Sequence, residues 1–161
     1  MKSLWAPWRL PYLKGKKAKA CIFCLGARAD DRRRHVLHRN RSTFVIMNAY
    51  PYSNGHLMVA PYRHVANLNK LPSAVLGELL ATTQLAISAL QAVYAPDGFN
   101  VGINFGKAAG AGIEAHLHLH IVPRWNGDTN FMSTVAGVRV IPEGLDHAYT
   151  QLLPRFRRQA K

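Results

Sequence analysis

The strongest constraint on the fold is the segment HLHLHIV, in which histidines occupy three alternate positions, His116, His118 and His120. Side chains at alternate positions of a half-buried strand share one face, so we predict a strand over 116–122 with the imidazoles on one side. The apolar residues that would face the other side are Leu117, Leu119 and Ile121. Each imidazole needs a hydrogen-bond partner or water, so packing alone does not explain three of them, and the pattern indicates a functional site.

Apolar patterning predicts the other elements. Residues 43–48 (TFVIMN), 55–61 (GHLMVAP) and 99–105 (FNVGINF) favour strands. Between them, residues 72–94 favour a long helix that begins near Pro72 and ends before Pro96. Its apolar stripe, at spacings of three and four, is Leu76, Leu79, Leu80, Thr83, Ile87, Leu90 and Tyr94. A weaker helix is expected over 142–158, with Pro154 interrupting its end.

The order of these elements indicates the fold class. The strands are short and mostly consecutive, and the long helix lies between two pairs of them, which is typical of an antiparallel α+β sheet. The chain has no GxxxxGK[ST] motif, and its glycine-rich segment 106–112 (GKAAGAG) precedes a strand where a phosphate-binding P-loop would precede a helix. We therefore predict a mostly antiparallel sheet with one long helix and a C-terminal helix.

Charge and length add two expectations. Residues 1–41 hold 12 of the 21 Lys and Arg residues and two of the eight acidic ones, so they carry most of the net charge of +13. Such a segment attracts phosphate-bearing partners in general, although the basic run 28–34 (RADDRRR) also suits a solvated loop. No continuous apolar run approaches the roughly 18–20 residues of a membrane span. We therefore expect one cytoplasmic unit without a membrane segment.

The triad segment resembles the H-φ-H-φ-H-φ-φ signature, with φ apolar, of the histidine triad superfamily of nucleotide hydrolases and transferases. The resemblance extends from FVIMNAYPYSNGHLMVAPYRHV to GFNVGINFGKAAGAGIEAHLHLHIVPRWNGDTNF. The last of these residues, together with LWAPWRLPYL at 4–13, most resemble the bacterial branch described as diadenosine tetraphosphate phosphorylases or hydrolases. The resemblance implies a catalytic domain over 42–161 behind a basic segment over 1–41, and a homodimer or higher homo-oligomer.

The resemblance also implies roles for individual residues. His118 would attack the α-phosphorus of a nucleotide and form a nucleotidyl-histidine, since imidazole is a neutral nucleophile near pH 7 and a good leaving group once phosphorylated. His120 and His56 would donate hydrogen bonds to the phosphoryl oxygens and the leaving group. Asn48 and Asn104 match positions that contact ribose and phosphate.

The glycine-rich loop is the predicted phosphate-binding loop. Its backbone N–H groups would form an anion nest, and Lys107 would reach a distal phosphate. The residues of this nest are Gly106, Gly110, Ala111 and Gly112. The alternatives are a tight hairpin and a solvated lysine.

The only cysteines, Cys21 and Cys24, form the string CIFC, which supplies half of a tetrahedral zinc site. The resemblance implies that His64 and His116 complete it, and a closed site of this kind makes zinc structural. A redox pair and two inert thiols are the alternatives. His35, His38 and His147 have no motif context and are expected at the surface.

Several functions fit these residues. The first is cleavage of dinucleoside polyphosphates such as diadenosine tetraphosphate, giving ADP and ATP with phosphate as acceptor or AMP and ATP with water. A purine nucleoside phosphoramidate hydrolase would use the same residues. A different class is a basic zinc-containing nucleic-acid-binding module, which the lack of a second CxxC and of alternating aromatic and basic residues disfavours.

Overall fold

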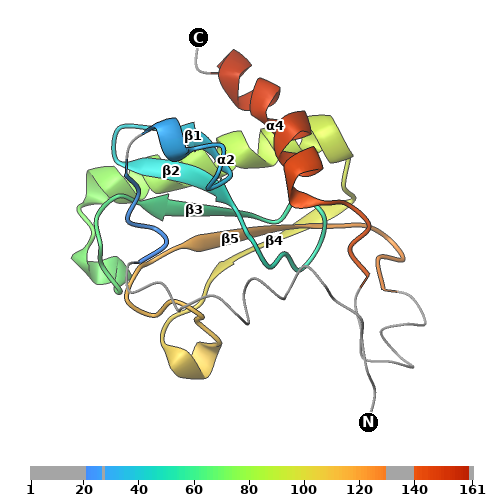
Figure 1. Cartoon of the computed structure of the whole chain (residues 1–161). Helices are drawn as coiled ribbons and strands as arrows, with labels where there is room; N and C mark the ends of the chain where they lie inside the picture. The colour runs from blue at the N-terminus through green and yellow to red at the C-terminus, as the bar shows by residue number, and fades with distance from the viewer. Residues whose placement is uncertain (1–20, 27, 130–139, 160–161) are drawn as a thin grey trace, which may run out of the picture.

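The computed structural model describes residues 21–26, 28–129 and 140–159, which form a five-stranded sheet and its covering helices (Figure 1). All strand pairs are antiparallel, in the order β1-β2-β3-β5-β4. The strands are β1 (Val36–Arg39), β2 (Thr43–Met47), β3 (Leu57–Pro61), β4 (Gly98–Ile103) and β5 (Leu119–Arg124). The α+β class is therefore confirmed.

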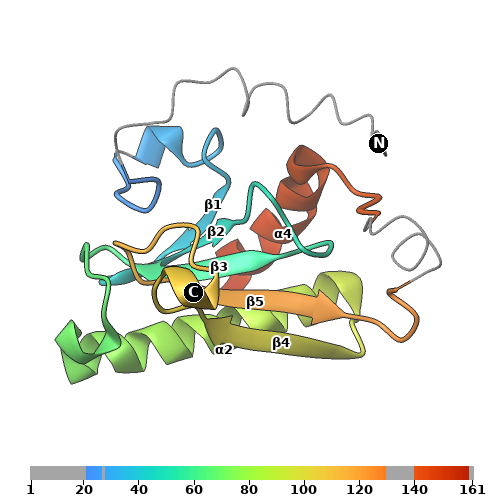
Figure 2. The same ribbon diagram turned by 90° about the horizontal axis from the view of Figure 1, so that it is seen from below.

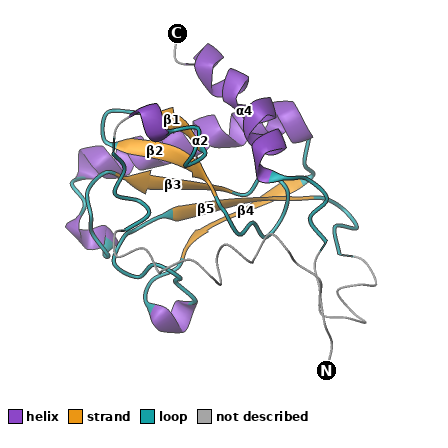
Figure 3. Cartoon of the chain, in the orientation of Figure 1, coloured by secondary structure: helices purple, strands orange, loops and turns teal. Residues whose placement is uncertain are grey.

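Two long helices share one side of the sheet. Helix α2 (Ser73–Tyr94) runs along that face (Figure 2), and α4 (Leu145–Gln159) packs on α2 and on β1. The short 3-10 helices are η2 (Arg28–Asp30), η3 (Leu68–Lys70) and η4 (Lys107–Ala109), and η4 projects away from the sheet on the loop between β4 and β5 (Figure 3).

The two faces of the sheet bury different clusters. Leu117, Leu119 and Ile121 belong to the helix-side core, as their alternation with the histidines predicts. The opposite face is covered by the segment at the start of the described chain, where Phe23 packs in a smaller apolar cluster. The other members of this cluster are Val36, Phe44, Ile46, Met58 and Ala60. The histidines therefore lie on the face that α2 and α4 leave open.

The predicted strand over 116–122 is shifted in the structure. Strand β5 begins only at Leu119, where β4 still pairs with it through Ile103. Before that residue the chain follows a different partner, because the N–H of Leu117 donates to the carbonyl of Val65 at 2.6 Å. His116 and His118 thus precede the strand, and His120 is the one triad histidine within it.

The helices differ from prediction in two details. Leu80 is 56% exposed, because it lies about 100° around the helix from Leu79, which is in the centre of the buried stripe. The small residues Thr82, Ala86 and Ala89 are buried instead. Pro154 lies inside α4 and does not interrupt it.

Helix α2 also bears on the membrane expectation. Among the described residues it is the one helix whose length and apolar composition would suffice to cross a membrane. In the structure it packs against the sheet and α4, as the core helix of a folded domain does.

The basic segment 28–34 is more than a solvated loop. Asp31 accepts a 2.6 Å hydrogen bond from Arg39 on β1, and the Arg34 guanidinium donates to the carbonyl oxygen of Cys24 at 3.3 Å. His35 is only partly exposed, because it contacts Asp146 and Tyr149 of α4. The segment is thus joined to the sheet through Asp31, and to α4 through the adjoining His35 and through Arg32, which lies 5.7 Å from the Tyr149 ring centroid.

The other two histidines expected at the surface, His38 and His147, differ in exposure. His38 is half-buried, and its ring stacks on Phe156 of α4 with 5.9 Å between ring centroids. His147 is exposed as expected, with its Nδ1 2.7 Å from a carboxylate oxygen of Glu143.

Candidate functional site

Strand register brings two of the predicted catalytic histidines together. His120 on β5 lies opposite Met58 on β3 and Gly102 on β4. His56 precedes β3 by one residue and has the same parity as Met58, so its side chain lies diagonally across from His120 on the same face. Their rings are 5.2 Å apart, with 3.0 Å between His56 Nε2 and His120 Nδ1.

Hydrogen bonds fix the proton positions of this pair. His56 Nδ1 accepts from the backbone N–H of Tyr52 at 3.1 Å, so the proton of a neutral His56 ring is on Nε2. His56 Nε2 then donates to His120 Nδ1, which leaves the proton of His120 on its own Nε2. His120 is thereby a donor toward whatever binds at this face.

His118 has the opposite proton arrangement. Its Nδ1 donates to the carbonyl oxygen of His116 at 2.8 Å, so the lone pair of a neutral ring is on Nε2. The ring is nearly buried and lies 4.8 Å from the His120 ring at 66°. A ring with a free Nε2 lone pair therefore packs beside a ring that keeps an N–H donor, and nucleophilic attack on phosphorus needs both groups.

Burial keeps these rings neutral. Desolvation, together with the neighbouring imidazoles His120 and His118, lowers the pKa of His56 to about 3. Desolvation and the nearby His118 lower the pKa of His120 to about 4. The pKa of His118 is also lowered by desolvation, against the opposing effect of its bond to the His116 carbonyl. All three are uncharged at neutral pH.

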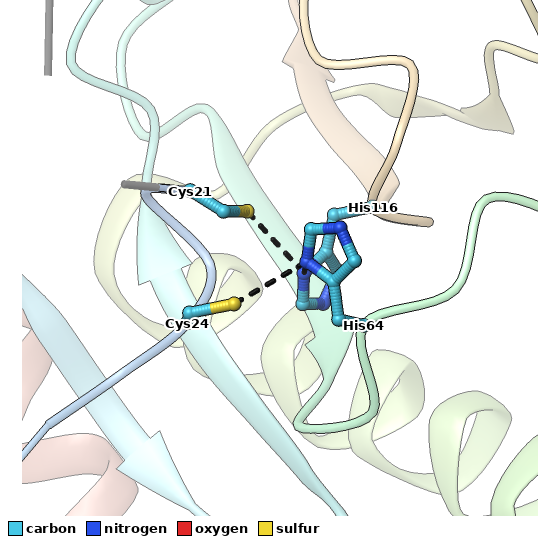
Figure 4. A group of neighbouring side chains, drawn as sticks. All are labelled: Cys21, Cys24, His64 and His116. Carbon is cyan, nitrogen blue, oxygen red and sulfur yellow. Dashed lines mark hydrogen bonds between the residues drawn. The ribbon is translucent and has the colours of Figure 1, made fainter. Parts of the chain in front are cut away.

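A second group joins the CIFC segment to two histidines (Figure 4). The ligand atoms of Cys21, Cys24, His64 and His116 all lie within 4.8 Å of one another. Cys21 Sγ is 3.4 Å from His116 Nδ1, Cys24 Sγ is 3.3 Å from His64 Nδ1, and the two Nδ1 atoms are 3.3 Å apart. Zinc bonds of about 2.0–2.1 Å to nitrogen and about 2.3 Å to sulfur give tetrahedral edges of about 3.3–3.8 Å.

The chemistry of the four donors fits such an ion as well. His116 is fully buried, and its Nε2 donates to the carbonyl oxygen of Pro61 at 2.8 Å. This bond leaves the Nδ1 lone pair directed at the cluster, which is how metal-binding histidines are usually oriented. Both cysteines are free thiols. The residues that the sequence predicts as zinc ligands are thus gathered around one point.

The predicted nucleotide contacts lie around the histidines. Asn48 Oδ1 accepts the backbone N–H of Tyr50 at 2.8 Å, and its amide nitrogen is 3.4 Å from His56 Nδ1. Asn104 lines a cavity of about 390 Å³ beside His120. The other residues lining this cavity are Tyr52, Asn100, Val101, Gly102, Val122 and Arg124.

The glycine-rich loop is arranged differently from a fully open nest. The N–H groups of Gly110 and Ala111 bond to the carbonyls of Lys107 and Gly106, at 3.0 and 3.3 Å. Gly106 and Gly110 have φ of 71° and 82°, which favours glycine. Lys107, Gly106 and Gly112 are exposed, and Gly106 lines a second cavity of about 730 Å³ with residues 66–69. Two of the four residues predicted to form the nest, Gly110 and Ala111, therefore have N–H groups already bonded within the loop.

Two aromatic residues at the site were not predicted. Tyr52 lies 4.7 Å from the His56 ring and 6.0 Å from His120, and Phe23 lies 4.5 Å from His118. The position of Phe23 between Cys21 and Cys24 could have predicted this contact. If both cysteines bind the ion that His116 binds, the residues between them must also lie close to the histidines. Tyr52 lies in a turn, where no periodicity marks the direction of a side chain.

Comparisons with known proteins identify the family of this chain. The HIT domain family matches residues 30–127, and the chain belongs to that family, whose members are nucleotide hydrolases and transferases. Among named relatives, the AP-4-A phosphorylase of Mycobacterium tuberculosis is 39% identical over 99% of this chain and 86% of its own length.

Two solved structures share the fold. A Zn-bound histidine triad family protein from Mycobacterium smegmatis is 27% identical, covers 88% of this chain and 96% of its own, and has a TM-score of 0.67. A hypothetical histidine triad nucleotide-binding protein from Sulfolobus tokodaii is 25% identical, covers 86% and 93%, and also has a TM-score of 0.67.

Proposed function

We propose that this protein cleaves dinucleoside polyphosphates, with diadenosine tetraphosphate as the leading substrate, through a nucleotidyl-histidine at His118. The observation that carries the proposal is the set of hydrogen bonds that leaves a bare Nε2 on the His118 ring and an N–H on the adjacent His120 ring. The 39% identity to an AP-4-A phosphorylase over nearly the whole chain supports this choice of substrate.

The proposed reaction has two displacements. His118 Nε2 forms a bond to one α-phosphorus of diadenosine tetraphosphate while the bond from that phosphorus to the bridging oxygen breaks, and ATP leaves. The His120 Nε2–H, oriented through His56, donates to an oxygen of the reacting phosphate. Water then releases AMP from His118, or inorganic phosphate releases ADP, and the imidazole returns to its neutral form.

Zinc is the proposed structural ion. Cys21, Cys24, His64 and His116 would hold it, and the Zn-bound relative from Mycobacterium smegmatis supports this assignment. Four protein ligands leave no open position, so its contribution is to the fold and not to a chemical step. We further propose that the protein is cytoplasmic and forms a homodimer or higher homo-oligomer. We also propose that a basic segment over 1–41 precedes a catalytic domain over 42–161.

The substrate and the reaction products distinguish the alternative enzymatic functions. A phosphoramidate hydrolase would use the same histidines and prefer an AMP–amine substrate. A nucleic-acid-binding zinc module is disfavoured, because the thiols of CIFC face His64 and His116 where a zinc ribbon would use a second CxxC. Phosphate-dependent formation of ADP distinguishes phosphorolysis from hydrolysis.

The test is turnover of diadenosine tetraphosphate and of an AMP–amine, each with and without added phosphate, with products separated by chromatography. We expect His118→Ala to abolish turnover while its fold and zinc content stay unchanged. His147→Ala is the matched control, because His147 is exposed on α4. Retained turnover in His118→Ala would refute the mechanism.

A further inference from the structure

Phe23 links the metal cluster to the proposed nucleophile. Its side chain is fully buried, and its ring centroid is 4.5 Å from that of His118, with 30° between the planes. The same ring is 5.3 Å from the His116 ring. One aromatic side chain therefore contacts both a histidine of the cluster and the histidine proposed to attack phosphorus.

The loop that carries Phe23 is held from both sides. The thiols of Cys21 and Cys24 face the cluster, and the N–H of Cys24 donates to the carbonyl of Cys21 at 3.1 Å. On the outside, the Arg34 guanidinium donates to the carbonyls of Ile22 and Cys24, the residues on either side of Phe23. The backbone of Phe23 is thus fixed independently of its side-chain packing.

The ring of His118 needs such a support. Its hydrogen bond to the His116 carbonyl fixes one ring atom, but the torsion that turns an imidazole is broad and has no sharp minimum. Packing against a flat neighbour fixes the plane. Phe23 provides that neighbour on one side, and the edge-on His120 ring lies 4.8 Å away.

We infer that Phe23 is a positioning residue for His118. Its ring packs between the cysteine–histidine cluster and the proposed nucleophile, and it restricts the His118 ring to the plane in which Nε2 meets phosphorus. This inference rests on the proposed role of His118. It assigns the CIFC segment a part in catalysis through packing, in addition to its proposed part in the fold.

The test compares Phe23→Leu with Phe44→Leu in the full-length, zinc-loaded protein. Phe44 is the matched control, because it is also fully buried in the same cluster and its ring lies 6.5 Å from that of Phe23. Phe44→Leu therefore disturbs the same packing but leaves the Phe23 ring in place beside His118. We expect Phe23→Leu to lower kcat about 10- to 100-fold, with KM within about twofold and zinc content unchanged. Phe44→Leu should keep kcat within about twofold. Equal losses of kcat in the two variants would overturn the inference.

Nitrogen NMR of the His118 ring gives a readout that does not depend on turnover. The wild type and Phe44→Leu should show one tautomer with the proton on Nδ1, whereas Phe23→Leu should show a mixture. Phe23→Met, which keeps the bulk but lacks a flat ring, replaces Phe23→Leu if that variant does not fold. An unchanged spectrum refutes positioning, while a wild type that cleaves no dinucleotide refutes only the proposed function.

Discussion

Stability should fall on acidification because His56 is buried as a neutral ring. Its pKa is lowered to about 3, from an ordinary value near 6.5, mainly by desolvation. The unfolded chain therefore binds a proton at this position at higher pH than the folded protein does. The contribution of His56 to stability is complete above about pH 6.5 and is lost progressively between about pH 6.5 and about pH 3.

The size of this loss follows from linkage. A pH of about 5 lies about 1.5 units below the ordinary pKa of histidine. At this pH the histidine of the unfolded chain is almost fully protonated, whereas His56 in the folded protein is still neutral. At about 1.4 kcal/mol per unit, His56 alone should lower the free energy of unfolding by about 2 kcal/mol between pH 7.5 and pH 5.

The assay is urea unfolding at these two pH values, for the wild type and for His56→Gln, at one fixed zinc concentration. Glutamine does not titrate, so His56→Gln should lose about 2 kcal/mol less than the wild type on acidification. Release of metal at low pH is common to both proteins and cancels in the comparison. Equal losses in the two proteins would show that His56 is not held neutral.

Two further predictions concern the metal and the turn before His56. Cys24→Ser should weaken zinc binding at least about tenfold, or about 1.4 kcal/mol, in competition with a chelator, and unchanged affinity would refute the ligand assignment. Gly55→Ala should destabilise the protein by about 1–3 kcal/mol in urea unfolding, because φ is +70° and a Cβ would lie 2.8 Å from the Tyr94 ring. The control Gly77→Ala, on the open face of α2, should stabilise it by about 0.5–1 kcal/mol, and equal effects would contradict the steric argument.

Periodicity predicted the sheet well because it depends on burial alone. The alternation around His118 placed its apolar neighbours in the helix-side core, as observed. The long helix also lies where expected, within one residue at its start. Periodicity did not predict the features that depend on strand pairing. Strand β1 forms by pairing with β2, and β5 begins at Leu119, the residue that pairs with Ile103 at the end of β4.

The candidate site was predictable in its histidines and not in its proton positions. Motif spacing placed His118 and His120 on one face, but their tautomers depend on backbone groups. The partner that sets His56 is the Tyr52 N–H, in a turn whose geometry no sequence pattern fixes. The prediction that Leu80 is buried was also wrong. Large apolar residues dominate a sequence pattern, whereas small residues such as Ala86 are the ones that α2 buries against its neighbours.

The position of His116 two residues before His118 also explains why the cysteine–histidine cluster and the proposed nucleophile lie together. Both residues precede β5, and the ring of Phe23 packs against both, so a group that fixes the first also approaches the second. The carbonyl of His116 orients His118, while its Nδ1 faces the cysteines. Any ion held by this cluster would thus fix the peptide whose carbonyl sets the His118 tautomer, while taking no part in a chemical step itself.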